Sequence, residues 1–222
     1  MATYYQYCPV ARAAEIVAER WSLLIVRNLL WGATTFTDLA AGVPHMSRSM
    51  LIKRLRELEH NGVIVATPKP NGQGSIYALT DAGRDLAAVI GELAAWAEHW
   101  VDVRSEHTDP GFALWVWCRV QLNRAALPRE RVLIAFRFPD ERAGNQRFWL
   151  LVTDGDAEVC VSDPGGELAA EVVARSRAFV DWHRGALPWR DAVRSGAIVV
   201  HGRHAVVRGL PTWNLRAPRA GA

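Results

Sequence analysis

Lysine and cysteine are scarce in this chain of 222 residues, and it has no long hydrophobic run. Only two of the 26 basic residues are lysines, Lys53 and Lys69. The longest unbroken apolar run, Phe112–Cys118, has seven residues, whereas a membrane-spanning helix needs roughly 20. Three scattered cysteines are too few for a disulfide scaffold or a CxxC metal site. The first residues have neither the basic nor the apolar segment of a signal peptide, so we expect a cytoplasmic protein with no membrane partner.

The remaining composition is typical of a globular protein of one or two domains. Half of the residues are hydrophobic, 22% are charged, and the formal net charge is +3. A basic surface attracts phosphate, but residues 1–107 carry 10 basic against 11 acidic side chains, and residues 108–222 carry 16 against 12. The positive net charge therefore lies in the second half of the chain. It does not support nucleic-acid binding by the first half.

The polar cluster His107–Gly111 contains helix breakers and divides the chain into predicted domains 1–106 and 107–222. The first domain has apolar spacings, caps and turns that predict two helices, a short helix, a longer helix, a hairpin and a long helix. These elements are expected, in this order, within Ala11–Trp31 with a break near Arg20 and Ser22, and at Thr35–Ala41, Ser47–His60, residues 63–67, residues 75–79 and after Thr80. A helix-turn-helix followed by a hairpin is a winged helix.

The second domain has a different pattern, with short β-rich runs separated by turn residues. The predicted fold is therefore α+β, with a mainly helical winged helix-turn-helix domain followed by an α+β domain. Residues 112–122 form an apolar segment that fits either a helix or a strand. Strands are expected near residues 131–138, 147–153, 157–162, 168–174 and 197–201, and helices near 177–185 and 188–195, with a last turn ending at Trp213.

The helix predicted over Ser47–His60 has two chemically different faces. Leu51, Leu55 and Leu58 share one face, which belongs to the core. The opposite face and its flanks carry Arg48, Ser49, Ile52, Lys53, Arg54 and Arg56. Small hydroxyl and basic side chains backed by leucines suit the DNA major groove, where they reach bases and phosphates. The alternative is an ordinary solvated helix face, since Glu57 and Glu59 lie on this helix too.

The long helix after Thr80 carries a narrow apolar seam. Its members recur at steps of four, three, four and three residues, the spacing of a helix that packs against another helix. They are Leu86, Ile90, Leu93, Ala97 and Trp100, which we expect to be dimerisation residues.

Several segments of the first domain resemble the HxlR family of bacterial transcription regulators. They are Cys8-Pro-Val-Ala-Arg12, Trp21–Gly32, Phe36-Thr-Asp-Leu39, Ser47–Gly62, which resembles the recognition helix of the family, and Tyr77–Gly83. The resemblance implies a winged-helix homodimer that binds a double-stranded DNA operator with two-fold related half-sites, and we expect a repressor. It implies DNA contacts from Ser47, Arg48, Ser49, Lys53 and Arg56 of the helix, beside the flanking Arg54, and from Lys69, Gln73 and Ser75 of the wing.

This chain departs from the family pattern at two places. Thr34-Thr35 stands where the family often has a basic pair, and the wing carries one lysine and no arginine. Both departures predict few phosphate contacts per subunit and hence a shallow salt dependence of DNA binding.

Cys8 lies where the members of the family that sense thiol-reactive species carry their cysteine. A thiol reacts as the thiolate, and Arg12 is one helical turn further on, where it would supply positive charge. The alternative is an inert cysteine near the start of a helix.

The second domain resembles the sterol-carrier-protein fold, in which helices cover one face of a sheet, often around an apolar cavity. The resemblance rests on Phe148–Cys160, Asp163-Pro-Gly165 and Trp189–Gly202. Six of the ten tryptophans lie in this domain, and aromatic residues in such number can line a ligand pocket or simply fill the core. We expect a small apolar or aromatic effector, with candidate ligand-binding residues Trp115, Phe136, Trp149, Trp182 and Trp189.

No enzyme motif stands out in the sequence. It has no nucleophile elbow, no HExxH and no arrangement of paired carboxylates, and its seven histidines do not follow a metal-ligand spacing. We therefore expect no cofactor, no metal site and no catalytic residue. The alternative is a small-molecule or lipid-binding module with enzymatic or carrier activity in the second domain.

Overall fold

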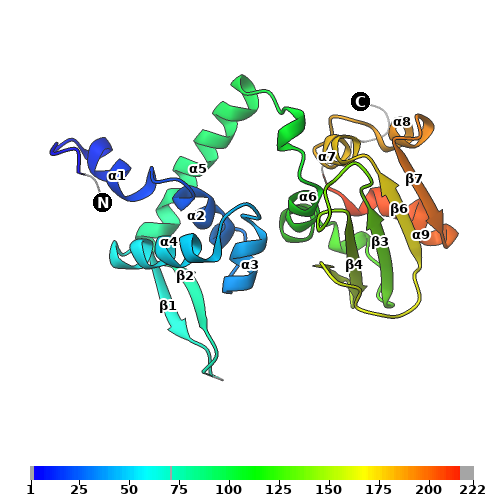
Figure 1. Cartoon of the computed structure of the whole chain (residues 1–222), viewed down its shortest axis with the longest axis horizontal. Coiled ribbons are helices and arrows are strands. Elements are labelled where there is room, and N and C mark those ends of the chain that lie inside the picture. The colour runs from blue at the N-terminus through cyan, green and yellow to red at the C-terminus, as the bar shows by residue number, and fades with distance from the viewer. Residues whose placement is uncertain (1–2, 71, 216–222) are drawn as a thin grey trace. The chain divides into compact units, whose positions relative to one another are not determined.

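The computed structural model describes residues 3–70 and 72–215, and the chain divides into two compact units, Met1–Asp102 and Val103–Ala222. Both units contain helices and strands (Figure 1). Among the described residues, no helix combines the length and the apolar character that crossing a membrane requires.

The first unit has the predicted order of a winged helix-turn-helix. Its elements are α1 (Pro9–Val17), α2 (Ser22–Leu30), α3 (Phe36–Ala41), α4 (Arg48–His60), β1 (Ile64–Pro68), β2 (Ser75–Leu79) and α5 (Asp81–Trp100). The predicted break between the first two helices is a turn at Trp21, whose φ of +83° prevents α1 from continuing into α2. Strands β1 and β2 pair antiparallel from Ile64–Leu79 to Pro68–Ser75 and form the wing.

Side-chain caps begin the helices of this unit where the sequence predicts them. Thr35 accepts the backbone N–H of Asp38 at 3.2 Å at the start of α3, and Thr80 accepts that of Gly83 at 3.1 Å at the start of α5. The Thr80 hydroxyl also donates to the carbonyl of Gly62 at 2.6 Å, which ties the start of α5 to the end of α4. Gly83 approaches the residue before β1 so closely that a Cβ there would lie 2.1 Å from the carbonyl oxygen of Val63.

The second unit is a five-stranded sheet with helices on one face. Its elements are a 3-10 turn (Ser105–His107), α6 (Pro110–Val116), a π-helical turn (Trp117–Gln121), a 3-10 turn (Arg124–Ala126), β3 (Val132–Arg137), β4 (Arg147–Thr153), β5 (Asp156–Cys160), β6 (Ala170–Ala174), α7 (Ser176–His183), α8 (Trp189–Arg194), β7 (Ile198–Gly202), α9 (His204–Gly209) and a final 3-10 turn (Leu210–Trp213). Residues 112–122, for which the sequence fits either a helix or a strand, are thus mainly helical. Helix α9 was not predicted from the sequence.

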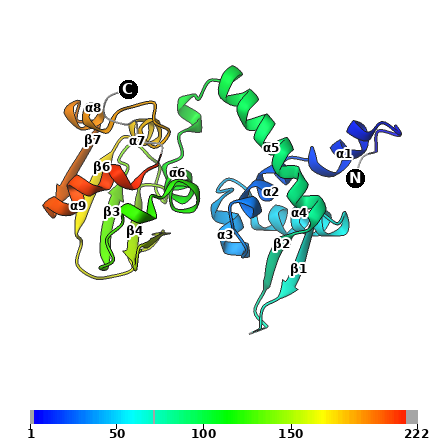
Figure 2. The same cartoon turned by 180° about the vertical axis from the view of Figure 1, so that it is seen from behind.

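The strand order is β5-β4-β3-β6-β7, with β3 and β6 parallel and the other neighbours antiparallel. One face of the sheet, with Ile134, Phe136 and Val172, packs against the helices and forms the core. Figure 1 shows the strands in front of α9, and Figure 2, from behind, shows α9 in front of the strands. Successive strand residues point to opposite faces, so Ala135, Arg137 and Trp149 lie on the other face, which we call the open face.

Candidate nucleic-acid interface

Helix α4 is fixed from its first residue by a side-chain cap and along its length by leucines. The Ser47 hydroxyl accepts the backbone N–H of Met50 at 3.2 Å, which satisfies one of the free N–H groups at the helix start. Leu51, Leu55 and Leu58 are all buried, as the spacing predicts. Their burial orients the opposite face of the helix toward solvent.

That opposite face is small, polar and basic, with one exposed isoleucine among its members. Ser49, Lys53 and Arg56 are exposed on it, together with Ile52. Arg48 lies at the flank, with its guanidinium 4.9 Å from the centre of the Phe36 ring, so α3 restricts the positions that this arginine can adopt.

Arg54 does not belong to this surface, and our expectation that it contacts DNA is wrong. Its side chain is only 9% exposed, with Nη2 2.7 Å from a carboxylate oxygen of Glu19 and Nη1 bonded to Glu57. Helical spacing places Arg54 at the edge of the basic face. The sequence alone gives no sign that its acidic partner, Glu19, lies 35 residues earlier in the chain. Its role in the structure is to join α4 to the segment between α1 and α2.

Two polar residues of α2 that the sequence analysis passed over hold the helix-turn-helix together. Arg27 donates to the carbonyl of Gly42, at the end of α3, at 3.0 Å, and to the Asn28 side chain at 2.8 Å. The buried Asn28 donates to the carbonyl of Leu39 at 3.4 Å. Burial lowers the pKa of Arg27 to about 10, so the side chain is still charged at neutral pH. The signal in the sequence was an Arg-Asn pair inside the otherwise apolar helix Ser22–Leu30.

The wing presents its predicted residues at the hairpin end. Gln73 is exposed, Lys69 and Ser75 are half-buried, and the Lys69 N–H donates to the carbonyl of Gly74 at 3.0 Å. Asn71, in the predicted turn, lies outside the described residues. The base of the wing is attached to the segment before α3, because the Tyr77 N–H donates to the carbonyl of Thr34 at 2.8 Å.

Helix α5 exposes an apolar stripe that shares Leu93 and Trp100 with the predicted seam. Of the predicted residues, Leu86, Ile90 and Ala97 are half-buried, and α5 packs against α2. The large apolar side chains that remain exposed recur at steps of four, three and four residues: Val89, Leu93, Trp96 and Trp100. Of the 20 residues of this helix only Gly83 is buried, so most of its apolar surface has no partner within the described chain.

Cys8 occupies the N-cap position of α1 and is half-buried. Arg12, expected to provide positive charge nearby, forms an ion pair with Glu15. Glu15 also accepts the hydroxyl of Thr3 at 2.7 Å and the N–H of Tyr4 at 2.8 Å, and these hydrogen bonds lower its pKa. The segment before Cys8 is therefore held against α1 by one carboxylate.

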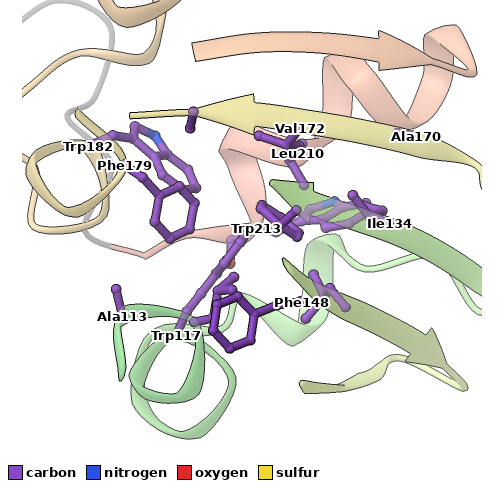
Figure 3. Packing of buried hydrophobic residues seen from close by; sticks show 14 of the residues in the cluster. Ala113, Trp117, Ile134, Phe148, Ala170, Val172, Phe179, Trp182, Leu210 and Trp213 are labelled. Atoms are coloured by element: carbon purple, nitrogen blue, oxygen red, sulfur yellow. The ribbon is translucent and has the colours of Figure 1, made fainter. Parts of the chain in front are cut away.

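The five predicted ligand-binding residues of the second unit do not line one cavity, and the expectation of a common aromatic pocket is wrong. Trp182 is fully buried, with its ring centre 5.2 Å from that of Trp117 and 4.9 Å from that of Trp189. Figure 3 shows Trp182, Phe179 and Trp117 among the side chains of the core. Trp115 is buried and stacks on Phe112. Trp117 and Trp182 fill the core with Trp189 packed against it, because a domain of this size needs large apolar residues there.

Phe136 and Trp149 have different surroundings. Phe136 lies in the same aromatic core, but it also borders a hollow on the open face of the sheet, and Trp149 lines that hollow. Within the described residues, no group of three or more His, Cys, Asp and Glu side chains could hold a metal ion.

A capped helix with a basic face, a preceding short helix and an attached wing define a winged helix-turn-helix protein. The model of the HxlR-like helix-turn-helix family matches residues 16–105. The uncharacterized HTH-type transcriptional regulator YvaP of Bacillus subtilis (strain 168) is 39% identical over 99 residues, which are 44% of this chain and 92% of that protein. The HTH-type transcriptional regulator YodB of the same organism is 34% identical over 97 residues, 43% of this chain and 87% of that protein.

This chain belongs to the HxlR-like helix-turn-helix family through its first unit, and the relatives that it matches are transcriptional regulators. The solved structure of the reduced form of YodB aligns with 44% of this chain and 97% of that chain, at 33% identity and a TM-score of 0.38. These matches cover less than half of the chain and say nothing of the second unit.

Proposed function

We propose that the protein is a homodimeric transcription repressor that binds a two-fold related DNA operator through α4 and the wing. The observation that carries this proposal is the exposed face of α4, where Ser49, Lys53 and Arg56 stand opposite a fully buried leucine stripe. Hydroxyl and guanidinium groups on such a face reach base edges in the major groove, and the lysine and the flanking Arg48 reach phosphates.

The test begins with DNA selected from a random pool by the full-length protein, and it measures affinity by fluorescence anisotropy. Arg56→Gln should weaken binding by roughly tenfold or more, since a base or phosphate contact of an arginine contributes about 1–3 kcal/mol. Arg190→Gln removes the same charge from an exposed position on α8 and should leave affinity unchanged. Equal affinities of the two variants would contradict the proposed interface, and a promoter–reporter fusion measures whether binding represses.

A second copy of the chain is the partner we propose for the exposed stripe of α5. Val89, Leu93, Trp96 and Trp100 leave a continuous apolar surface in water, and Tyr4, Tyr5 and Tyr7 before α1 are exposed as well. Monomeric proteins seldom leave such surfaces uncovered, whereas a two-fold operator requires two copies of α4.

Cys8 is the proposed site of a redox response. It is not fully buried, and it is the N-cap residue of α1, so that a thiol-reactive compound can reach it. The ion pair of Arg12 with Glu15 weakens the part of this proposal that depended on Arg12.

For the second unit we propose a sterol-carrier-like domain, starting near Val103, that binds a small effector and alters operator affinity. Its support is the arrangement of helices on one face of a five-stranded sheet and the hollow beside Trp149 on the other. The alternative function, a carrier or enzyme, would be favoured if the purified protein bound no selected DNA at all.

A further inference from the structure

The open face of the sheet in the second unit carries a small hollow with an unusual pair of charges at its rim. Its volume is about 190 Å³, and it lies over β3, β4 and β6. The side chains that decide its chemistry are Arg137, Arg147, Trp149, Asp163, Leu168 and Glu171. Arg137 and Arg147 stand directly opposite each other on antiparallel strands, a pairing of like charges that destabilises a sheet.

The two arginines differ in their partners. Arg137 forms an ion pair across the sheet with Glu171 at 3.4 Å, and His201 stands opposite Glu171 on β7. Arg147 is exposed and has no ion pair among the residues that the structure describes. The other carboxylate of the hollow, Asp163, accepts the N–H of Gly165 in its own loop at 2.8 Å. Of the two guanidinium groups in the hollow, that of Arg147 therefore has no ion pair within the described part of the chain.

An apolar surface lies beside that guanidinium. Trp149 is two residues after Arg147 on β4, so both side chains leave the same face of the sheet, and Leu168 is 47% exposed at the rim. Pockets that enclose drug-sized ligands occupy roughly 300–1,000 Å³, so this smaller hollow suits a single ring. A planar guanidinium binds a carboxylate through two parallel hydrogen bonds, and an indole ring offers a flat apolar face.

We propose that this hollow binds a small aromatic carboxylate, with its carboxylate on Arg147 and its ring against Trp149. A neighbouring hollow of about 160 Å³ on the same face is lined by Leu151, Thr153, Asp156, Ala157 and Glu158, none of which is a basic residue that could bind a carboxylate. The proposal gives the site and the ligand class of the effector role proposed above and so rests on it. Its test measures binding without DNA, so its failure would leave the DNA-binding proposal untouched.

The test uses the full-length protein and the ¹⁹F NMR signals of three probes with the same ring: 4-fluorobenzoate, 4-fluorobenzyl alcohol and 4-fluorobenzylamine. The benzoate signal should broaden, and its affinity should exceed those of the alcohol and the amine by at least roughly tenfold, the contribution of one hydrogen-bonded ion pair. Arg147→Gln should weaken benzoate binding by roughly ten- to a hundredfold without lowering the melting temperature, because the substitution also removes the like-charge pair. Arg190→Gln, on α8, is the charge-matched control and should bind benzoate as the unchanged protein does.

A second variant tests the ring contact separately. Trp149→Leu keeps an apolar side chain on the open face and should weaken benzoate binding while circular dichroism shows an unchanged fold. Three results would overturn the proposal: equal affinity for all three probes, benzoate binding unaffected by Arg147→Gln, or a change of oligomeric state in that variant. The last result would make the open face an interface between copies of the chain.

Discussion

Replacing Arg54 by methionine separates the residue that holds α4 in place from the residues proposed to contact DNA. Methionine retains the apolar stem and removes the charge, leaving Glu19 and Glu57 without their shared partner. Loss of one partner from a fully buried ion pair costs about 3–5 kcal/mol, whereas an exposed pair contributes about 0–1 kcal/mol. Glu19 is 38% exposed and Glu57 25%, so water screens the pairs, and we expect a loss of about 2 kcal/mol.

In a unit of about 100 residues, each kcal/mol shifts the melting temperature by roughly 4–8 °C, so Arg54→Met should lower it by about 8–16 °C. Thermal unfolding followed by circular dichroism measures this shift, and fluorescence anisotropy at 15 °C measures operator affinity while the unit is folded. Arg56→Met is the matched control on the same helix, and it should weaken DNA binding and leave the melting temperature nearly unchanged, because Arg56 is exposed. If Arg54→Met melts like the unchanged protein and loses operator affinity as Arg56→Met does, Arg54 contacts DNA and our interpretation is refuted.

The packing of Gly83, the assembly through α5 and the reactivity of Cys8 can each be tested separately. Gly83→Ala should destabilise the first unit by about 1–3 kcal/mol in urea unfolding, because its Cβ would meet the carbonyl of Val63. This loss is expected even though alanine favours helices, and unchanged stability would contradict the close packing of Gly83. Leu93→Glu should shift the dimer toward monomer in sedimentation velocity, whereas Ala87→Glu, exposed on the opposite side of α5, should not; dimers in both variants would argue against the stripe. Iodoacetamide at pH 8 should label Cys8 well before Cys118, because burial raises the pKa of the Cys118 thiol to about 12. Peptide mass spectrometry measures the order of labelling, and labelling of Cys118 before Cys8 would contradict this prediction. Cys8→Ser should abolish release of operator DNA by diamide if Cys8 is the redox site.

The first unit was readable from sequence because its signals are local. Caps such as Ser47 and Thr80 act on N–H groups three residues away, and Leu51, Leu55 and Leu58 follow the helical period. The sequence could not assign Arg54, since an arginine at the edge of a helix face becomes buried or exposed according to a partner distant in the chain. The same limit applies to α5. Its helical spacing predicts an apolar face, but it does not tell which apolar residues pack within the first unit and which remain exposed.

In the second unit the strands could be predicted from the sequence, but the order in which they pair in the sheet could not. Strand β6 enters the sheet beside β3, although two other strands separate them in the chain, and this parallel pairing brings Glu171 to Arg137. Counting tryptophans could not separate Trp182, in the core, from Trp149, on the open face, because both are apolar residues in amphipathic elements. The alternation of residues along β4 separates the two faces, but only the packing of the core shows which face the helices cover.

Whether α4 contacts DNA is tested directly by the affinity of one double variant, Lys53→Gln with Arg56→Gln, for DNA selected by the unchanged protein. Both side chains are exposed on α4 and neither is needed for its packing, so the variant should fold normally. We expect a loss of at least roughly a hundredfold in affinity, with a salt dependence shallower than that of the unchanged protein, because each subunit loses two cationic contacts. Operator binding by the folded double variant with unchanged affinity and unchanged salt dependence would contradict the claim that α4 reads DNA.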